Sequence, residues 1–197
     1  MSLILQTNMS AAADVTKLLE TFGSQIWETL EFRGEHTVRV KLDSLHATLA
    51  KCRNDLGYEM ILDISSLDHF GDEPRFEMVY EIATLDDSKH LRIKAQVSED
   101  EAVPSVTDLW VGADWHEREV WDMMGIPFTG HPNLKRILMW EGYPFFPLRK
   151  DFPLAGRPSE MPDVAFTGVA PLEGGPFVTS CGSDDVAKRE PRAQVVE

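Results

Sequence analysis

The chain has only two cysteines, Cys52 and Cys181, among its 197 residues. Two distant cysteines cannot build a disulfide framework, and they cannot supply the four thiolates of an iron–sulfur cluster. No apolar run approaches the roughly 20 residues that cross a bilayer. The N-terminal segment has neither the basic start nor the apolar stretch of a signal peptide. We therefore expect the chain to fold in a reducing, cytoplasmic setting.

Basic residues are also scarce, with 19 Lys and Arg against 33 Asp and Glu and a net charge of -14. Nucleic acids and anionic lipid surfaces are bound by clustered Lys and Arg, so neither is expected as a direct partner. The sequence contains no Gly-x-Gly-x-x-Gly run, P-loop, Gly-x-Ser-x-Gly elbow or His-Glu-x-x-His pair. These absences exclude the standard templates for nucleotide binding, serine hydrolysis and zinc proteolysis.

Seven segments before residue 100 show the hydrophobic pattern of regular elements. Apolar residues recur at helical spacing in 12–22 and 43–56, and Gly57 is suited to end the second helix. Asp43 or Ser44 is suited to cap its start. The strand-forming patterns lie at 27–32, 37–41, 59–66, 76–84 and 90–97, the last two as a hairpin. The order helix, two strands, helix, three strands predicts a two-layer α+β domain.

A further helix is predicted from Asp114 to Met124, ending at Gly125. Asp114 stands where a cap is expected, with Glu117 three residues on, as in a capping box. Plotted at 100° intervals, Glu117 falls in the middle of the apolar arc of this helix. The opposite side of the helix carries Arg118, Glu119 and Asp122. Arg118 and Asp122 are four residues apart and can pair.

A carboxylate within an apolar arc needs a partner, because leaving it unpaired costs several kcal/mol. Arg136 and Arg149 are the nearest candidates by sequence, and a guanidinium can bind both carboxylate oxygens. We predict that Glu117 is held by one of them or by an arginine of a partner protein. The alternative is a frayed helix end, with Glu117 solvated.

From about residue 144 the composition changes. Eight of the twelve prolines lie in this part and no helical or strand period persists, so it cannot cover itself with a core. Isolated apolar residues such as Phe152 and Phe166 are suited to anchor an arm on another surface. We therefore predict two parts, an α+β domain over 1–125 and an extended docking arm over 126–197, with the last residues disordered.

Charge is segregated along the second half of the chain. Residues 99–122 hold eight acidic residues against Arg118 alone, whereas 131–157 hold five basic residues against two acidic ones. The basic segment is expected to fold back on the acidic helix or to face an acidic partner. Aromatic residues interleave with its cations, a composition typical of interface hot spots. A single-stranded nucleic acid groove has similar residues, but the overall acidity argues against it.

A metal site is a weaker alternative. His116 and Glu119 are three apart on the predicted helix, and His131 is a possible third ligand. A histidine near a helix start is more often a hydrogen-bonding surface residue. On this hypothesis the chain would be a free-standing small metalloenzyme.

The residues from 117 to 153 resemble a known family. The matching motifs are Glu117-Arg118-Glu119, Asp122-Met123-Met124-Gly125-Ile126, Gly130-His131-Pro132, Arg136-Ile137-Leu138-Met139 and Leu148-Arg149-Lys150-Asp151-Phe152-Pro153. They resemble the C subunit of the bacterial proton-pumping NADH:quinone oxidoreductase, respiratory complex I. One departure is that Phe145-Phe146-Pro147 stands where the family commonly has Gly-His-Pro.

The resemblance implies a peripheral-arm subunit on the cytoplasmic side of the bacterial membrane, without a catalytic, cofactor-binding or metal-binding residue of its own. Flavin and iron–sulfur clusters would belong to partner subunits. The C-terminal arm would lie against the quinone-site D subunit, close to the cluster-bearing B and I subunits. The residues expected to fix the arm and its docking are Glu117, Arg118, Glu119, Asp122, His131, Lys135, Arg136, Arg149, Lys150 and Asp151.

Two other assignments stay open from the sequence. The chain could be the equivalent subunit of a membrane-bound hydrogenase or of another quinone-reducing complex with a different electron donor. It could also be a soluble scaffold unrelated to respiration.

Overall fold

The computed structural model describes residues 2–140, 142–153, 164–165 and 168–169. The chain forms two compact units, Met1–Arg149 and Lys150–Glu197. The first unit contains three α-helices, α1 (Ser2–Phe22), α2 (Leu45–Leu56) and α3 (Ala113–Met124), and two short 3-10 turns, Gly23–Gln25 and Leu42–Ser44. Its strands are β1 (Ile26–Phe32), β2 (Glu35–Val40), β3 (Met60–Asp68), β4 (Phe76–Ala83), β5 (His90–Val97), β6 (Val103–Pro104) and β7 (Phe128–Thr129).

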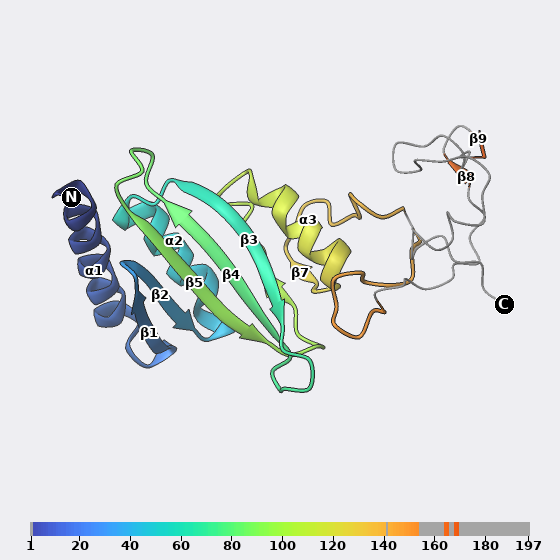
Figure 1. Cartoon of the computed structure of the whole chain (residues 1–197), viewed down its shortest axis with the longest axis horizontal. Coiled ribbons are helices and arrows are strands. Elements are labelled where there is room, and N and C mark those ends of the chain that lie inside the picture. Colours follow the sequence, from blue (N-terminus) through green and yellow to red (C-terminus); the bar gives the residue numbers. More distant parts are fainter. Residues whose placement is uncertain (1, 141, 154–163, 166–167, 170–197) are drawn as a thin grey trace. The chain divides into compact units, whose positions relative to one another are not determined.

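Strands β1 to β5 form one sheet in the order β1-β2-β5-β4-β3 (Figure 1). The central pair β2 and β5 is parallel and the other pairs are antiparallel. Helix α2 lies behind the sheet in Figure 1 and buries Leu45, Leu49 and Cys52 in the common core. The predicted two-layer α+β fold is confirmed.

The alternation in β4 and β5 shows why these segments form strands. In β5 every second residue from Leu91 to Val97 is buried, whereas almost all of β4 is buried and every second residue from Phe76 to Ile82 belongs to the hydrophobic core. Side chains on a strand alternate between the two faces, so these residues enter the core together. The predicted hairpin is confirmed, since β4 and β5 pair along their whole length.

Two predicted helix ends are confirmed and two predicted caps are wrong. Gly57 and Gly125 end α2 and α3 in the left-handed conformation. At the start of α2, however, the Ser44 hydroxyl donates to the carbonyl of Lys41 and makes no capping bond. Helix α3 begins after Gly112, which places Asp114 inside the first turn instead of at the cap. The Asp114 carboxylate is directed to tertiary partners instead.

Helix α1 also begins earlier than predicted, at Ser2 instead of residue 12. Its described buried side chains include Ala11 and Leu18, which pack toward the sheet. None of the helices in the described ranges combines the length and the apolar character needed to cross a bilayer.

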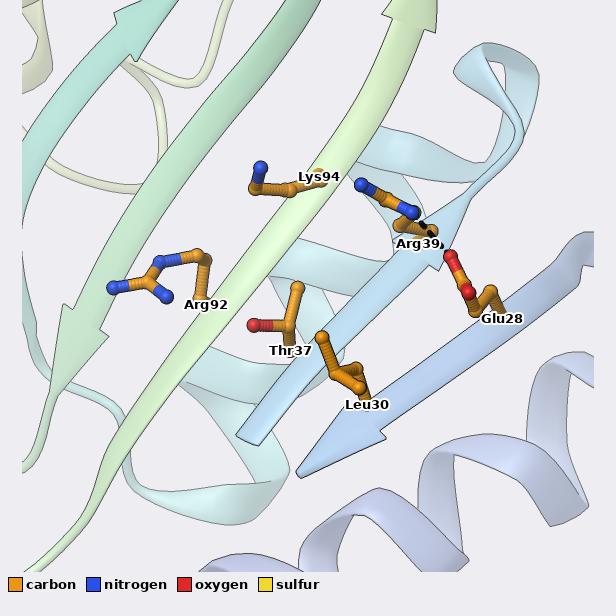
Figure 2. A pocket seen from close by; sticks show the side chains of 6 residues that line it. All are labelled: Glu28, Leu30, Thr37, Arg39, Arg92 and Lys94. Atoms are coloured by element: carbon orange, nitrogen blue, oxygen red, sulfur yellow. Dashed lines mark hydrogen bonds and ion pairs between the residues drawn. The ribbon is translucent and has the colours of Figure 1, made fainter. Parts of the chain in front are cut away.

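The face of the sheet that points away from α2 carries a ladder of ion pairs. Arg39 pairs with Glu28 and with Glu77, Lys94 pairs with Glu77 at 2.9 Å, and Arg92 pairs with Glu81. This face has a hollow of about 110 Å³. Figure 2 shows the side chains of β1, β2 and β5 that line it. Because each cation in its lining is already paired with a glutamate, the hollow has no free cation for an anionic ligand.

The second unit is described in fewer residues. Val164–Ala165 (β8) pairs antiparallel with Gly168–Val169 (β9). This short pair differs from the prediction that no strand forms in the tail. The predicted disorder of the last residues falls outside the described ranges, and the boundary between a domain over 1–125 and an arm over 126–197 stays a prediction.

Candidate functional site

Asp122, near the end of α3, anchors the segment that follows β7. Its side chain is completely buried. Oδ2 accepts three consecutive backbone N–H groups, from Ile137, Leu138 and Met139, at 2.9, 2.7 and 2.9 Å. Oδ1 accepts a 2.7 Å hydrogen bond from Nη1 of Arg136. One carboxylate therefore fixes four consecutive residues of the arm against α3.

The charge state of Asp122 follows from these contacts. Burial by itself would raise the pKa of its carboxyl group. The three backbone N–H groups and the Arg136 guanidinium outweigh burial and lower that pKa below its ordinary value. The predicted pairing of Arg118 with Asp122 is wrong. The plot at 100° intervals placed Asp122 on the side of α3 opposite the apolar arc. In the structure the arm covers α3 at Asp122.

Two arginines of the arm stack on one ring. The guanidinium carbons of Arg136 and Arg149 lie 5.1 and 4.6 Å from the centroid of Phe146. Arg149 Nε donates to the carbonyl of Met124 at 2.6 Å, and its Nη1 pairs with Glu99 at 2.7 Å. Arg149 thus caps the carbonyl end of α3, where a cation is favourable. The basic segment folds back onto the acidic one, as one of the two sequence hypotheses expected.

Gly125 leaves room for this stack. Its φ is +74°, and a Cβ added there would lie 2.6 Å from two Phe146 ring atoms and 2.8 Å from Arg149 Nη2. We expect Gly125→Ala to lower the free energy of unfolding by about 1–2 kcal/mol for the left-handed backbone and about 1–3 kcal/mol more for displacing the stack. Denaturant unfolding of the purified chain measures this loss.

Gly57→Ala is the matched control, because Gly57 ends α2 at φ +81° with no atom within 4 Å of the added Cβ. It should show the backbone cost alone. Equal losses in the two variants would mean that the packing of Phe146 and Arg149 on Gly125 adds nothing.

Glu117 is buried as predicted, with 0% of its surface exposed. The predicted arginine partner within the chain is wrong, because Arg136 binds Asp122 and Arg149 binds Glu99. Instead, Glu117 Oε1 accepts the backbone N–H of Val106 at 2.7 Å. Burial raises the pKa of the Glu117 carboxyl group above its ordinary value, against the opposing effects of Val106, the Ser105 hydroxyl and His131. This contact ties α3 to the segment that precedes it.

His131 and Arg118 make further contacts between α3 and the arm. The His131 ring is completely buried, with Nε2 3.2 Å from Oδ1 of Asp114. Arg118 Nε donates to the carbonyl of Lys135 at 3.1 Å, and its Nη1 lies 3.8 Å from Asp114. The side chain of Lys135 is exposed. Asp114 therefore positions the arm, which explains why it does not cap the helix.

The outer surface of α3 and the arm keeps large apolar side chains in solvent. Trp115 is 62% exposed and lies one helical turn before Glu119, which is also exposed. The others are Val111, at 88%, Leu138, at 61%, Leu148, at 62%, and Trp140, at 39%. Below, this set of Val111, Trp115, Leu138, Trp140 and Leu148 is called the outer apolar set. The sequence flagged Trp140, through the aromatic composition of the basic segment, but not the other four.

Lys150 and Asp151 lie at the start of the second unit, and both are exposed. The three residues of the metal hypothesis are not gathered in one place. His116 Nδ1 lies 3.3 Å from Asp63, whereas His131 faces Asp114. The described part of the chain holds no group of three His, Cys, Asp or Glu side chains arranged for a metal ion. Cys52 is buried in the core, which raises the pKa of its thiol to about 12.

Taken together, the fold and the site define a class: a two-layer α+β domain whose last helix uses buried carboxylates to anchor an extended arm. The family of the 30 kDa subunit of the respiratory-chain NADH dehydrogenase matches residues 38–158. The chain belongs to this family. The match begins within β2 and includes α2, β3 to β5, α3 and the arm contacts described above.

Curated relatives agree. The chain is 43% identical over 147 residues to the C subunit of the NADH-quinone oxidoreductase of Citrifermentans bemidjiense, covering 74% of this chain and 91% of the relative. It is 46% identical over 118 residues to the C 2 subunit of the same enzyme in Rhizobium meliloti, covering 60% and 65% of the two chains. The resemblance to the C subunit of complex I is confirmed.

Two solved structures share the fold. A trypsin-resistant fragment (1-134) of Nqo5 superposes with a TM-score of 0.55 at 29% identity, covering 61% of this chain and 98% of the fragment. A chain of an archaeal membrane-bound sulfane sulfur reductase superposes with a TM-score of 0.63 at 23% identity, covering 73% and 85%. The second likeness concerns the fold alone.

Proposed function

We propose that this chain is a non-catalytic peripheral-arm subunit of the proton-translocating NADH:quinone oxidoreductase, and that it stabilises the complex by docking on neighbouring subunits. One observation carries the proposal. The charged residues of the family motif, Asp122, Arg136 and Arg149, are used within the chain to fix the arm, while the outer apolar set stays in solvent. Rigidly held apolar side chains are typical of surfaces that bind other proteins.

The proposed partners are the quinone-site D subunit and the cluster-bearing B and I subunits. Flavin and iron–sulfur clusters belong to partner subunits in this proposal, and the complex holds the chain at the cytoplasmic side of the bacterial membrane. The support is membership of the C-subunit family together with an arm that carries apolar side chains outward. Glu119, exposed beside Trp115, gives this surface an acidic group for a basic neighbour.

Replacing Leu138 by serine tests the docking surface. The side chain is mostly exposed, so the variant should fold within about 0.5 kcal/mol of the parent. We expect it to reduce severalfold the amount of partner subunits that co-purify with the tagged chain from native membranes, because a buried interface leucine is worth about 1.5–3 kcal/mol. Quantitative mass spectrometry of the co-purified proteins measures the loss.

Leu85→Ser is the matched control, since Leu85 is 67% exposed in the turn between β4 and β5, away from α3. It should leave co-purification unchanged. Equal recovery of partners with both variants would count against a docking role for the surface around Leu138. The donor that the recovered complex oxidises separates NADH:quinone oxidoreductase from a related complex with another electron donor.

A further inference from the structure

Glu117 is a buried acid without a cation to balance it. No part of its side chain is exposed, Oε1 accepts the backbone N–H of Val106, and the Ser105 hydroxyl is the other donor that faces the carboxyl group. Its Oε2 has no hydrogen-bond partner among the described residues. One backbone N–H and one hydroxyl compensate an ionised carboxylate poorly, because burial removes the water that would otherwise solvate the charge. Asp122 shows the contrast, with three N–H groups and a guanidinium.

His131 does not supply the missing charge. Its Nε2 lies 3.9 Å from Glu117 Oε2 but only 3.2 Å from Asp114 Oδ1. Its Nδ1 accepts the backbone N–H of Asn133 at 3.0 Å, which requires an unprotonated Nδ1. Nε2 is therefore the ring nitrogen that can donate, and Asp114 is its nearer acceptor. Asp114 adds a like charge that opposes ionisation of Glu117.

The groups that face Glu117 come from each element packed around it. They are Asp114 on its own helix, the Ser105 hydroxyl and Val106 N–H on the preceding segment, His131 after β7 and Tyr80 on β4. The Tyr80 hydroxyl is also buried without a hydrogen-bond partner among the described residues. Burial and the charge of Glu117 both raise the pKa of Tyr80, so the two groups are within electrostatic reach. Of these groups only His131 can carry a positive charge, and its Nε2 lies nearer to Asp114 than to Glu117.

We propose that Glu117 is a proton-binding site of the folded chain, neutral while α3 is packed on the segment at 105–106. The ligand is a single proton on the carboxyl group. It is taken up when α3 packs and is released when this packing opens. The folding of the region that anchors the arm is thereby linked to pH.

The link fixes the direction of a pH effect. The unfolded chain loses this proton near the ordinary glutamate pKa of 4.5, whereas the folded chain keeps it to a higher pH. Stability from this group is therefore complete below 4.5 and falls as pH rises, until the raised pKa is passed. Relative to Glu117→Gln, which keeps the shape without the proton, the wild-type unfolding equilibrium constant should rise about tenfold per pH unit in that window.

Glu119→Gln is the matched control, the same substitution on the same helix at an exposed position. The wild-type unfolding equilibrium constant, taken relative to that of Glu119→Gln, should show no such rise with pH. The proposal would be overturned if the stabilities of wild type and Glu117→Gln changed in parallel with pH. It would also be overturned if wild type gained stability relative to Glu117→Gln as the pH rises.

A second measurement needs no variant. In the full-length chain labelled with ¹³C-glutamate, the carboxyl carbon shift of Glu117 is followed against pH beside that of Glu119. We expect the midpoint of Glu117 to lie above that of Glu119. A Glu117 midpoint at or below that of Glu119, or an ionised Glu117 beside a protonated His131, would contradict the assignment.

Discussion

Asp122→Ala is expected to lower the free energy of unfolding by about 3–5 kcal/mol, because it leaves a partly buried guanidinium and three partly buried N–H groups without their acceptor. The lost acceptor serves Arg136 and the backbone of 137–139. The arm should detach from α3 locally before the sheet unfolds. Denaturant unfolding gives the total loss, and hydrogen exchange at 137–139 should show faster exchange there.

The same site predicts a pH dependence of opposite sign to that of Glu117. The lowered pKa of Asp122 means that its stabilising effect is complete above the unfolded aspartate value of 3.8 and is lost as pH falls through the folded value. In Asp122→Ala this part of the acid sensitivity should disappear. Unfolding curves at several pH values below 5 would show it.

Asp55→Ala is the control for Asp122. Asp55 lies in the last turn of α2, as Asp122 does in α3, but it is exposed and pairs only with Lys51. Its loss should change stability by about 0.5 kcal/mol or less. If Asp122→Ala costs no more than this, the carboxylate does not anchor the arm.

Arg149→Ala has the second large expected effect. It removes the cap on the Met124 carbonyl, the ion pair with Glu99 and the stack on Phe146. We expect a loss of about 2–4 kcal/mol, the sum of a charged hydrogen bond and a partly desolvated cation–π contact. Because Arg149 fixes the arm to the end of α3, recovery of the assembled complex from membranes should fall as well.

Arg33→Ala is the control that measures the loss of an arginine–phenylalanine stack alone. Arg33 lies over Phe32 at 5.2 Å in an exposed turn, without a helix end to cap. Its replacement should cost less than about 1 kcal/mol. Arg149→Lys should restore part of the stability but not all, since lysine lacks the planar fork. If Arg149→Lys were as stable as wild type, the positive charge of Arg149 alone would explain its effect.

Much of the fold follows from local patterns. Alternation from Phe76 to Ile82 predicts β4, and glycines at 57 and 125 predict the ends of α2 and α3. The strand order does not follow, because β2 pairs in parallel with β5 across more than 50 residues of chain. Nothing local to either strand specifies that partner or its direction, since such pairing depends on how the whole core closes.

The sequence predicted the site only in part, because its contacts also join distant parts of the chain. The helical period correctly buries Glu117, but sequence distance cannot say which arginine reaches which carboxylate. Arg136 goes to Asp122 because three N–H groups already converge there and the arm returns along that side of α3. A wheel assigns the side opposite the core to solvent. It cannot anticipate that a later segment covers Asp122.

The most direct test of a non-catalytic docking role is the NADH:quinone activity per assembled complex in membranes that carry Leu138→Ser. The amount of complex is measured in parallel on native gels. The account predicts that activity falls only in proportion to the amount of complex, with unchanged turnover in what assembles. Full assembly with selectively slowed quinone reduction would contradict it and would give this chain a direct part in the chemistry.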